Sequence, residues 1–92
     1  MAIGDTKELE RVLRALGNKR RLALVRLLKK NRETNVTVLA EAISLSFRST
    51  SRHLVILFAA GVVDRRQQST EVYYFLAVRK HPTLEHVLSL LK

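Results

Sequence analysis

The chain has 92 residues and a formal net charge of +9, from 17 lysines and arginines against eight aspartates and glutamates. This length suits one small domain, and the charge predicts a polyanionic partner, most simply nucleic acid; an anionic membrane surface or a merely soluble basic protein are the alternatives. The lack of cysteine excludes a disulfide scaffold, a cysteine zinc site and a thiol sensor, and without a recognisable signal peptide or bilayer-spanning run we expect a cytoplasmic protein.

Two helices are predicted in the first third of the chain. Asp5 to Glu8 has the form of a capping box and opens a helix that Gly17 ends. Asn18 caps a second helix, from about Lys19 to Lys30, whose broad apolar arc indicates a place in the core. Its first turn carries Lys19, Arg20 and Arg21. Cations there oppose the helix dipole, a cost that a nearby DNA phosphate would offset; a solvated basic turn explains them equally well.

The next segment is typical of a helix-turn-helix. Residues 31–35 are polar and without periodicity, so we expect a loop. Thr37 can cap a short helix through about Ile43, and Ser46 can cap a longer helix that Gly61 ends. Two short helices joined by a few residues are the helix-turn-helix arrangement.

The helix over residues 46–60 has two unlike faces. Thr50, Leu54 and Leu57 share an apolar stripe at helical spacing. The opposite face carries Arg48, Arg52, Val55 and Ala59, with Ser51 at its flank. Arginine can bond two acceptors on guanine and serine can reach base or phosphate oxygens, so this face suits a DNA major groove. The alternative is an ordinary amphipathic helix with a solvated polar face.

Two apolar residues, Val55 and Ala59, extend that outward face beyond the arginines. A second protein-binding surface would account for them, and so would contacts to thymine methyl groups. Tolerated exposure of small side chains is the simplest explanation.

A β-hairpin is predicted over residues 62–76, because the apolar period changes from 3.6 to 2 after Gly61. Its connection lacks glycine, which predicts a longer loop rather than a two-residue turn. Arg65 and Arg66 are expected near the tip. There they would contact a minor groove or phosphates, or else guard an exposed strand edge.

Pro82 suits the first position of a last helix. This helix and the first one, at about 82–92 and 5–17, have equally apolar faces that we expect to form a two-fold dimer interface; packing within one protomer is the alternative. Such a dimer would set two reading helices about 34 Å apart, matching successive major grooves of a palindrome. The expected interface residues are Leu9, Val12, Leu13, Leu16, Leu84, Val87, Leu88 and Leu91.

Three stretches carry a family resemblance: LGNKRRL at 16–22, SRHL at 51–54 with Leu57, Ala60 and Gly61, and VYYFL at 72–76. Over roughly residues 9–76 the chain resembles the ArsR-type (arsenic-repressor-like) winged helix-turn-helix transcriptional regulators. The resemblance implies a mainly α fold with a small β-hairpin, in the order α-α-α-α-β-β-α, and a homodimeric DNA-binding repressor. By position, the resemblance implies that four residues face DNA: Arg48, Ser49, Ser51 and Arg52. It also implies that Arg65 and Arg66 lie in the wing.

The family's metal sites are the main departure. Many relatives bind metals through cysteines in the third helix, where this chain has residues 38–43 and no thiol. His81 and Glu85 could share a helix face near His86 and complete a zinc site with a second chain, but we expect His81 to start the helix and Glu85 and His86 to be solvated. His53 is expected to be packed and hydrogen-bonded. We therefore expect no metal and no cofactor, and the sequence indicates no particular effector.

Together these features predict a homodimeric, sequence-specific regulator of transcription, most simply a repressor. We expect one domain over residues 1–92. It would place the 46–60 helix in the major groove and use the 62–76 hairpin as its wing. Lys19 and Arg20 would lie near phosphates. No catalytic constellation is recognisable, so we expect no enzyme. The alternatives are a non-specific or architectural DNA-binding protein and a winged-helix protein-interaction module anchored by Val55 and Phe58.

Overall fold

The computed structural model describes residues 5–92, which form five helices and three short strands. In chain order the elements are α1 (Thr6–Leu16), α2 (Lys19–Asn31), β1 (Thr34–Asn35), α3 (Val36–Ala42), α4 (Phe47–Ala59), β2 (Val63–Gln68), β3 (Glu71–Leu76) and α5 (Pro82–Leu90). This confirms the mainly α fold and the predicted order of four helices, a hairpin and a last helix. Residues 1–4, where we expect no signal peptide, lie outside the described residues. None of the helices in 5–92 is long and apolar enough to span a bilayer.

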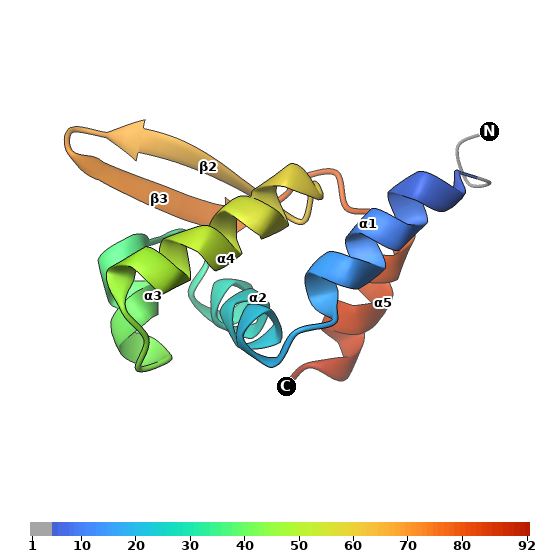
Figure 1. The fold of residues 1–92 in the computed structure, drawn as a ribbon, viewed down its shortest axis with the longest axis horizontal. Coiled ribbons are helices and arrows are strands. Elements are labelled where there is room, and N and C mark those ends of the chain that lie inside the picture. The colour runs from blue at the N-terminus through green and yellow to red at the C-terminus, as the bar shows by residue number, and fades with distance from the viewer. Residues whose placement is uncertain (1–4) are drawn as a thin grey trace.

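The helices are arranged around α2. Figure 1 shows α4 crossing over α2, with α1 and α5 side by side at one end of the molecule. The hairpin of β2 and β3 projects toward the opposite end, where α3 lies. Each element except β1 contributes to one apolar core, whose members include Val12, Leu24, Leu39, Leu54, Val63, Tyr74 and Leu84.

The helix boundaries follow from local signals. The side chains of Asp5, Asn18 and Ser46 each accept a backbone N–H of the following first turn, at distances between 2.9 and 3.2 Å. Gly61 lies just beyond α4 with a φ of 76°, a conformation that glycine adopts without steric cost. Pro82 is the first residue of α5. These five predictions are therefore confirmed.

The segment predicted as a loop, residues 31–35, contains the strand β1. It pairs antiparallel with β3, with Thr34 opposite Tyr74, and makes the sheet order β1-β3-β2. Two residues are too few for a period-two pattern to appear in the sequence. The predicted cap of α3 is also wrong: Asn35, rather than Thr37, accepts a first-turn N–H at 2.8 Å.

The turn of the hairpin is tighter than predicted. Gln68 pairs with Glu71, so only Ser69 and Thr70 connect β2 to β3. Ser69 takes a φ of 60°, the left-handed conformation that glycine usually supplies in such turns. The prediction of a longer loop is wrong because a serine here fills the place of the missing glycine.

Candidate nucleic-acid interface

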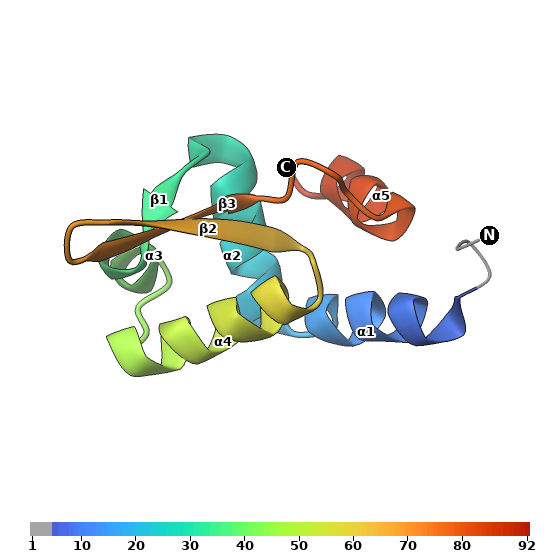
Figure 2. The ribbon, with the colours of Figure 1, turned by 90° about the horizontal axis from the view of Figure 1, so that it is seen from above.

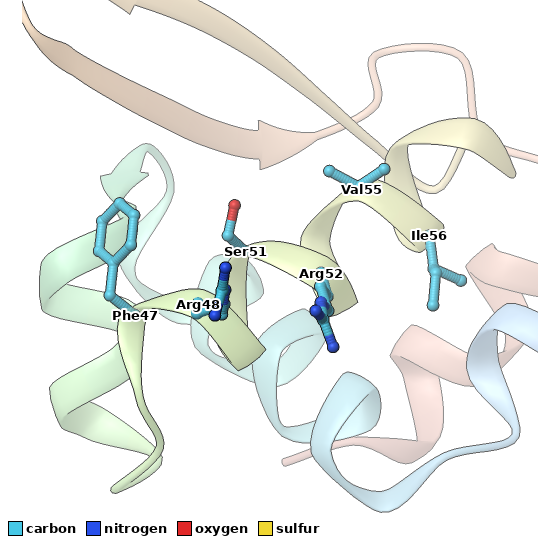
Figure 3. Close-up of a pocket in the computed structure, with 6 residues that line it drawn as sticks. All are labelled: Phe47, Arg48, Ser51, Arg52, Val55 and Ile56. Atoms are coloured by element: carbon cyan, nitrogen blue, oxygen red, sulfur yellow. The ribbon is translucent and has the colours of Figure 1, made fainter.

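The exposed face of α4 carries two parallel rows of side chains (Figure 3). One row is Phe47, Ser51 and Val55, and the other is Arg48, Arg52 and Ile56. Within the described residues, Arg48 and Arg52 are exposed and make no hydrogen bond or ion pair with another side chain. The predicted stripe of Thr50, Leu54 and Leu57 is buried on the opposite face. Two arginines one turn apart are thus presented to solvent on the second helix of a helix-turn-helix.

Large apolar side chains lie beside these arginines. Phe47 is 58% exposed, Val55 47% and Ile56 43%, although all three side chains are large and apolar. Val55 was predicted on this face from its position opposite the buried stripe, whereas Phe47 and Ile56 lie to either side of that position and were not predicted. Ala59 is exposed as predicted, whereas Phe58 is half-buried and packs against the core. Phe58 is therefore not available as the anchor of a protein-interaction surface.

The first helix adds positive charge next to α4. In Figure 2, α1 and α4 lie one after the other along one edge of the molecule. A shallow depression between them is lined by Lys7, Arg11 and Arg14 from α1 and by Ile56 and Ala59 from α4. Arg14 pairs with Glu10 at 3.0 Å, with both side chains largely exposed. These cations were not predicted as part of the site, although the positions 7, 11 and 14 repeat at helical spacing.

The three cations of the first turn of α2 have different environments. Lys19 and Arg20 are exposed. Arg21 points inward: its Nε donates to the carbonyl oxygen of Ala15 at 2.6 Å, and its Nη1 lies 3.1 Å from Nδ1 of His53. Only two of the three cations are thus presented to a partner, while Arg21 ties α2 to α1 and α4.

His53 is packed and hydrogen-bonded, as predicted. Its partner Arg21 can only donate, so Nδ1 of His53 must accept and the neutral imidazole carries its proton on Nε2. Partial burial and the positive charges of Arg21 and Arg20 lower the pKa of His53. The site therefore favours the neutral form of the ring.

Arg65 and Arg66, expected near the hairpin tip, lie within β2, four and three residues before Ser69 of the turn. They are opposite Tyr74 and Tyr73 along the strands. The tip consists of residues 67–71, which in sequence read QQSTE and carry no cation. Because β2 continues through Gln68 to a two-residue turn, neither arginine is part of the turn itself.

The two arginines project from opposite faces of the hairpin, and each contacts different residues. The guanidinium of Arg65 lies 4.0 Å from the ring centroid of Phe58 and donates to the hydroxyl of Tyr74 at 3.3 Å. Arg66 forms a two-pronged ion pair with Glu33, one bond of which measures 2.9 Å, and lies 5.0 Å from the ring centroid of Tyr73. This contact lowers the pKa of Glu33 and raises that of Arg66.

The leucines and valines expected at a dimer interface divide into three groups. Val12, Leu16 and Leu84 are fully buried in the protomer core, because α1 and α5 pack on each other and on α2. Val87, Leu88 and Leu91 are half-buried against that core. Leu9 and Leu13 are 37% and 51% exposed, and Leu90 of α5, outside the expected set, is 66% exposed. Among these α1 and α5 side chains, the members of this last group are the ones largely exposed to solvent.

Residues 5–92 hold no cluster of three histidine, aspartate or glutamate side chains that could bind a metal ion. Nδ1 of His81 accepts the backbone N–H of Thr83 at 3.1 Å, so His81 caps α5. This is the helix-start role predicted for it.

No protein-family model and no curated protein sequence matches the chain. Solved structures are similar over nearly its whole length. The transcriptional regulator HlyU from Vibrio vulnificus CMCP6 is 30% identical, with 98% of this chain and 90% of that chain covered and a TM-score of 0.75. The homodimeric winged helix-turn-helix DNA-binding domain Mb0332 from Mycobacterium bovis, a possible ArsR-family regulator, is 28% identical, with 97% and 79% covered and a TM-score of 0.80. The transcriptional repressor PagR of Bacillus anthracis is 26% identical, with 96% and 97% covered and a TM-score of 0.78.

The helix-turn-helix of α3 and α4, followed by the hairpin, defines the class of protein. The chain has the winged helix-turn-helix fold of DNA-binding transcriptional regulators. With 30% identity over 90% of the length of HlyU, it belongs to the same family of winged-helix transcriptional regulators as that protein.

Proposed function

We propose that the protein is a cytoplasmic, homodimeric repressor of transcription of the ArsR type, which binds an inverted repeat in double-stranded DNA and catalyses no reaction. In this proposal one domain over residues 1–92 inserts α4 into the major groove and uses the hairpin of β2 and β3 as its wing. The observation that carries it is the pair of exposed arginines on α4, Arg48 and Arg52, which have no partner within residues 5–92. Their long side chains are free to reach base edges without giving up a contact within the protein.

The proposed roles on α4 follow from side-chain chemistry. Arg48 and Arg52 bond the two major-groove acceptors of guanine. Ser51, half-buried between them on the neighbouring row, donates to a base or phosphate oxygen. Ser49 is half-buried, and its backbone N–H already bonds the cap Ser46 at 3.1 Å, so its hydroxyl is the part left for a phosphate.

Phosphate contacts are proposed for cations on both sides of α4. Lys19 and Arg20 lie at the start of α2, and Lys7 and Arg11 lie on α1 beside the end of α4. On the other side, Arg65 lies in the cleft between α4 and β2, which Phe47, Ser51 and Val55 also line. Arg66 is assigned a different role: because Glu33 compensates its charge, it holds the wing in place.

We propose that two protomers associate through α1 and α5. Leu9 and Leu13 line a shallow depression on the outer face of α1, and Leu90 is exposed on the neighbouring helix α5. Both helices, α1 and α5, lie at the end of the molecule opposite α3 (Figure 1). A two-fold axis there would leave both copies of α4 free for successive major grooves.

Selection of bound duplexes from a random DNA pool, followed by salt titration on the best and on a scrambled sequence, tests this function. We expect an inverted repeat bound more tightly than scrambled DNA by a factor of about 10³ or more. Lys30→Ala is the matched control for charge, since Lys30 lies at the far end of α2, exposed and without a partner among the described residues. Equal affinities that fall together as salt rises would instead indicate an architectural binder, and negligible binding at moderate salt a protein-interaction module.

A further inference from the structure

We propose that the apolar row of α4 makes this protein a reader of thymine: Val55 and Phe47 contact thymine C5-methyl groups beside the guanines bound by Arg48 and Arg52. The inference rests on the proposed DNA-binding function and specifies the bases that the operator must contain. The C5-methyl of thymine is the one apolar group that the base pairs of DNA present in the major groove.

The hairpin borders the row of Phe47, Ser51 and Val55 but, within the described residues, leaves Phe47 and Val55 uncovered. Phe47 and Val55 are both about half exposed, one at the start of α4 and the other two turns later. Exposure of apolar surface to water is unfavourable by about 25 cal/mol per Å². A partner that covers this surface would therefore gain free energy from each of the two side chains. Val55 is also β-branched and loses little rotamer freedom when it is covered.

The spacing of side chains along the two rows matches the spacing of base pairs along DNA. Residues four apart on a helix are separated by about 6 Å along its axis. Base pairs rise by about 3.4 Å, so each helical turn corresponds to about two base steps when α4 lies along the groove. The row of Phe47, Ser51 and Val55 runs beside the row of Arg48, Arg52 and Ile56 in Figure 3. A guanine facing one row and a thymine facing the other can then be neighbours in one half-site.

The positive charge around the apolar row favours DNA over a protein partner. Arg48 and Arg52 flank it on one side, and Arg65 lines the cleft on the other. A protein covering Val55 would have to pair or desolvate these three guanidinium groups. The major groove offers a methyl group, guanine acceptors and phosphates together, and so satisfies the apolar and the charged groups at once.

Ile56 supplies a matched control. It is as exposed as Val55 and lies on the same helix, but in Figure 3 it points toward α1, and it lines the depression between α1 and α4. We therefore assign it no base contact. Val55→Ala and Ile56→Ala remove similar apolar groups from neighbouring solvent-facing positions, so both variants should fold equally well, which circular dichroism and thermal unfolding would check.

The experiment replaces each thymine of the selected half-site in turn by deoxyuridine, which deletes only the C5-methyl group. With the wild-type dimer we expect one or two positions at which affinity falls about fourfold, the value for a group worth about 0.8 kcal/mol. Val55→Ala should weaken binding to the thymine duplex and abolish the uracil effect at one of these positions, as a double-mutant cycle measures. Phe47→Ala should do so at another, and Ile56→Ala at none.

The failures of the inference and of the function are distinguishable. Specific binding of an inverted repeat with no uracil effect at any position would overturn the inference and leave the regulator intact. A uracil effect that persists in both Val55→Ala and Phe47→Ala would assign the methyl contact elsewhere and also overturn it. Unchanged DNA affinity in Val55→Ala would point instead to a protein-binding face. The absence of any sequence preference would refute the proposed function itself, and the inference with it.

Discussion

Arg66 of β2 and Glu33, in the connection between α2 and β1, form a two-pronged ion pair that ties the wing to this connection. The adjacent Arg65 points to the opposite face of the hairpin and has no carboxylate partner among the described residues. The two arginines are neighbours in sequence and yet differ in the net charge that they can offer to DNA.

This difference predicts unequal salt dependence of DNA binding. Arg65→Ala should reduce the slope of log affinity against log salt by roughly 0.9 for one lost phosphate contact. Arg66→Ala should leave the slope nearly unchanged, because the phosphates gain no contact from a cation already paired with Glu33. Titrations of both variants on the selected duplex would measure the two slopes. A full decrease of the slope in Arg66→Ala would show that DNA displaces Glu33 from the pair.

Base reading by Arg52 predicts a loss that depends on sequence. Arg52→Ala should cost about 1–3 kcal/mol on the selected duplex and relax the preference at one base pair. Binding to duplexes mutated at each position in turn would locate that pair, and Lys30→Ala would report the effect of lost charge alone. Equal weakening on every sequence would make Arg52 a phosphate contact.

Much of the fold could be predicted because its signals are local. Asp5, Asn18, Ser46 and Gly61 act within one turn of their own position, and the stripe of α4 needs only helical periodicity. The strand β1 could not be found this way, since its two residues are specified by pairing with β3, about 40 residues later in the chain. The sheet register that places Arg66 beside Tyr73 and Glu33 is equally non-local.

Helical spacing alone predicts part of the candidate site, and tertiary packing decides the rest. Helical spacing puts Arg48 and Arg52 on the solvent face of α4, where the structure has them. On α1, helical spacing placed Val12 and Leu13 together in the expected dimer interface. The packing of α5 and α2 against α1 buries the first and leaves the second half-exposed, and the sequence of α1 alone does not contain that information.

The proposed dimer is best tested at Leu13. Leu13→Glu places a charge on the exposed side of α1 without entering the core, so it should yield a folded monomer. Leu88 is a poorer position, because it packs against the protomer core and its replacement would also destabilise the fold. Val38→Glu, at an equally exposed valine on α3, is the control that should remain dimeric. Sedimentation equilibrium would give both masses, and a dimeric Leu13→Glu would move the interface away from α1.

The contact between Arg21 and His53 predicts a stability that falls in mild acid. In the folded chain Nδ1 of His53 accepts from Arg21, and burial together with the charges of Arg21 and Arg20 lowers the pKa of the ring below its ordinary value of 6.5. The unfolded chain therefore binds the proton more readily, and the free energy of unfolding rises with pH where the unfolded ring titrates. The contribution of His53 should be complete above pH 6.5 and should be lost as the pH falls below it.

Urea unfolding at pH values between about 7.5 and 5.5 would measure this effect, since aspartate and glutamate with ordinary pKa values remain ionised over that range. His53→Gln removes the titrating group, so the variant should be less stable than the wild type at pH 7.5 but show a smaller loss on acidification. His86→Gln, at an exposed histidine of α5, should keep the wild-type slope. Because His53 lies on α4, the same protonation would loosen the helix proposed to read DNA, and affinity for the selected duplex should fall in parallel with stability. An unchanged slope in His53→Gln would assign the pH dependence to another group.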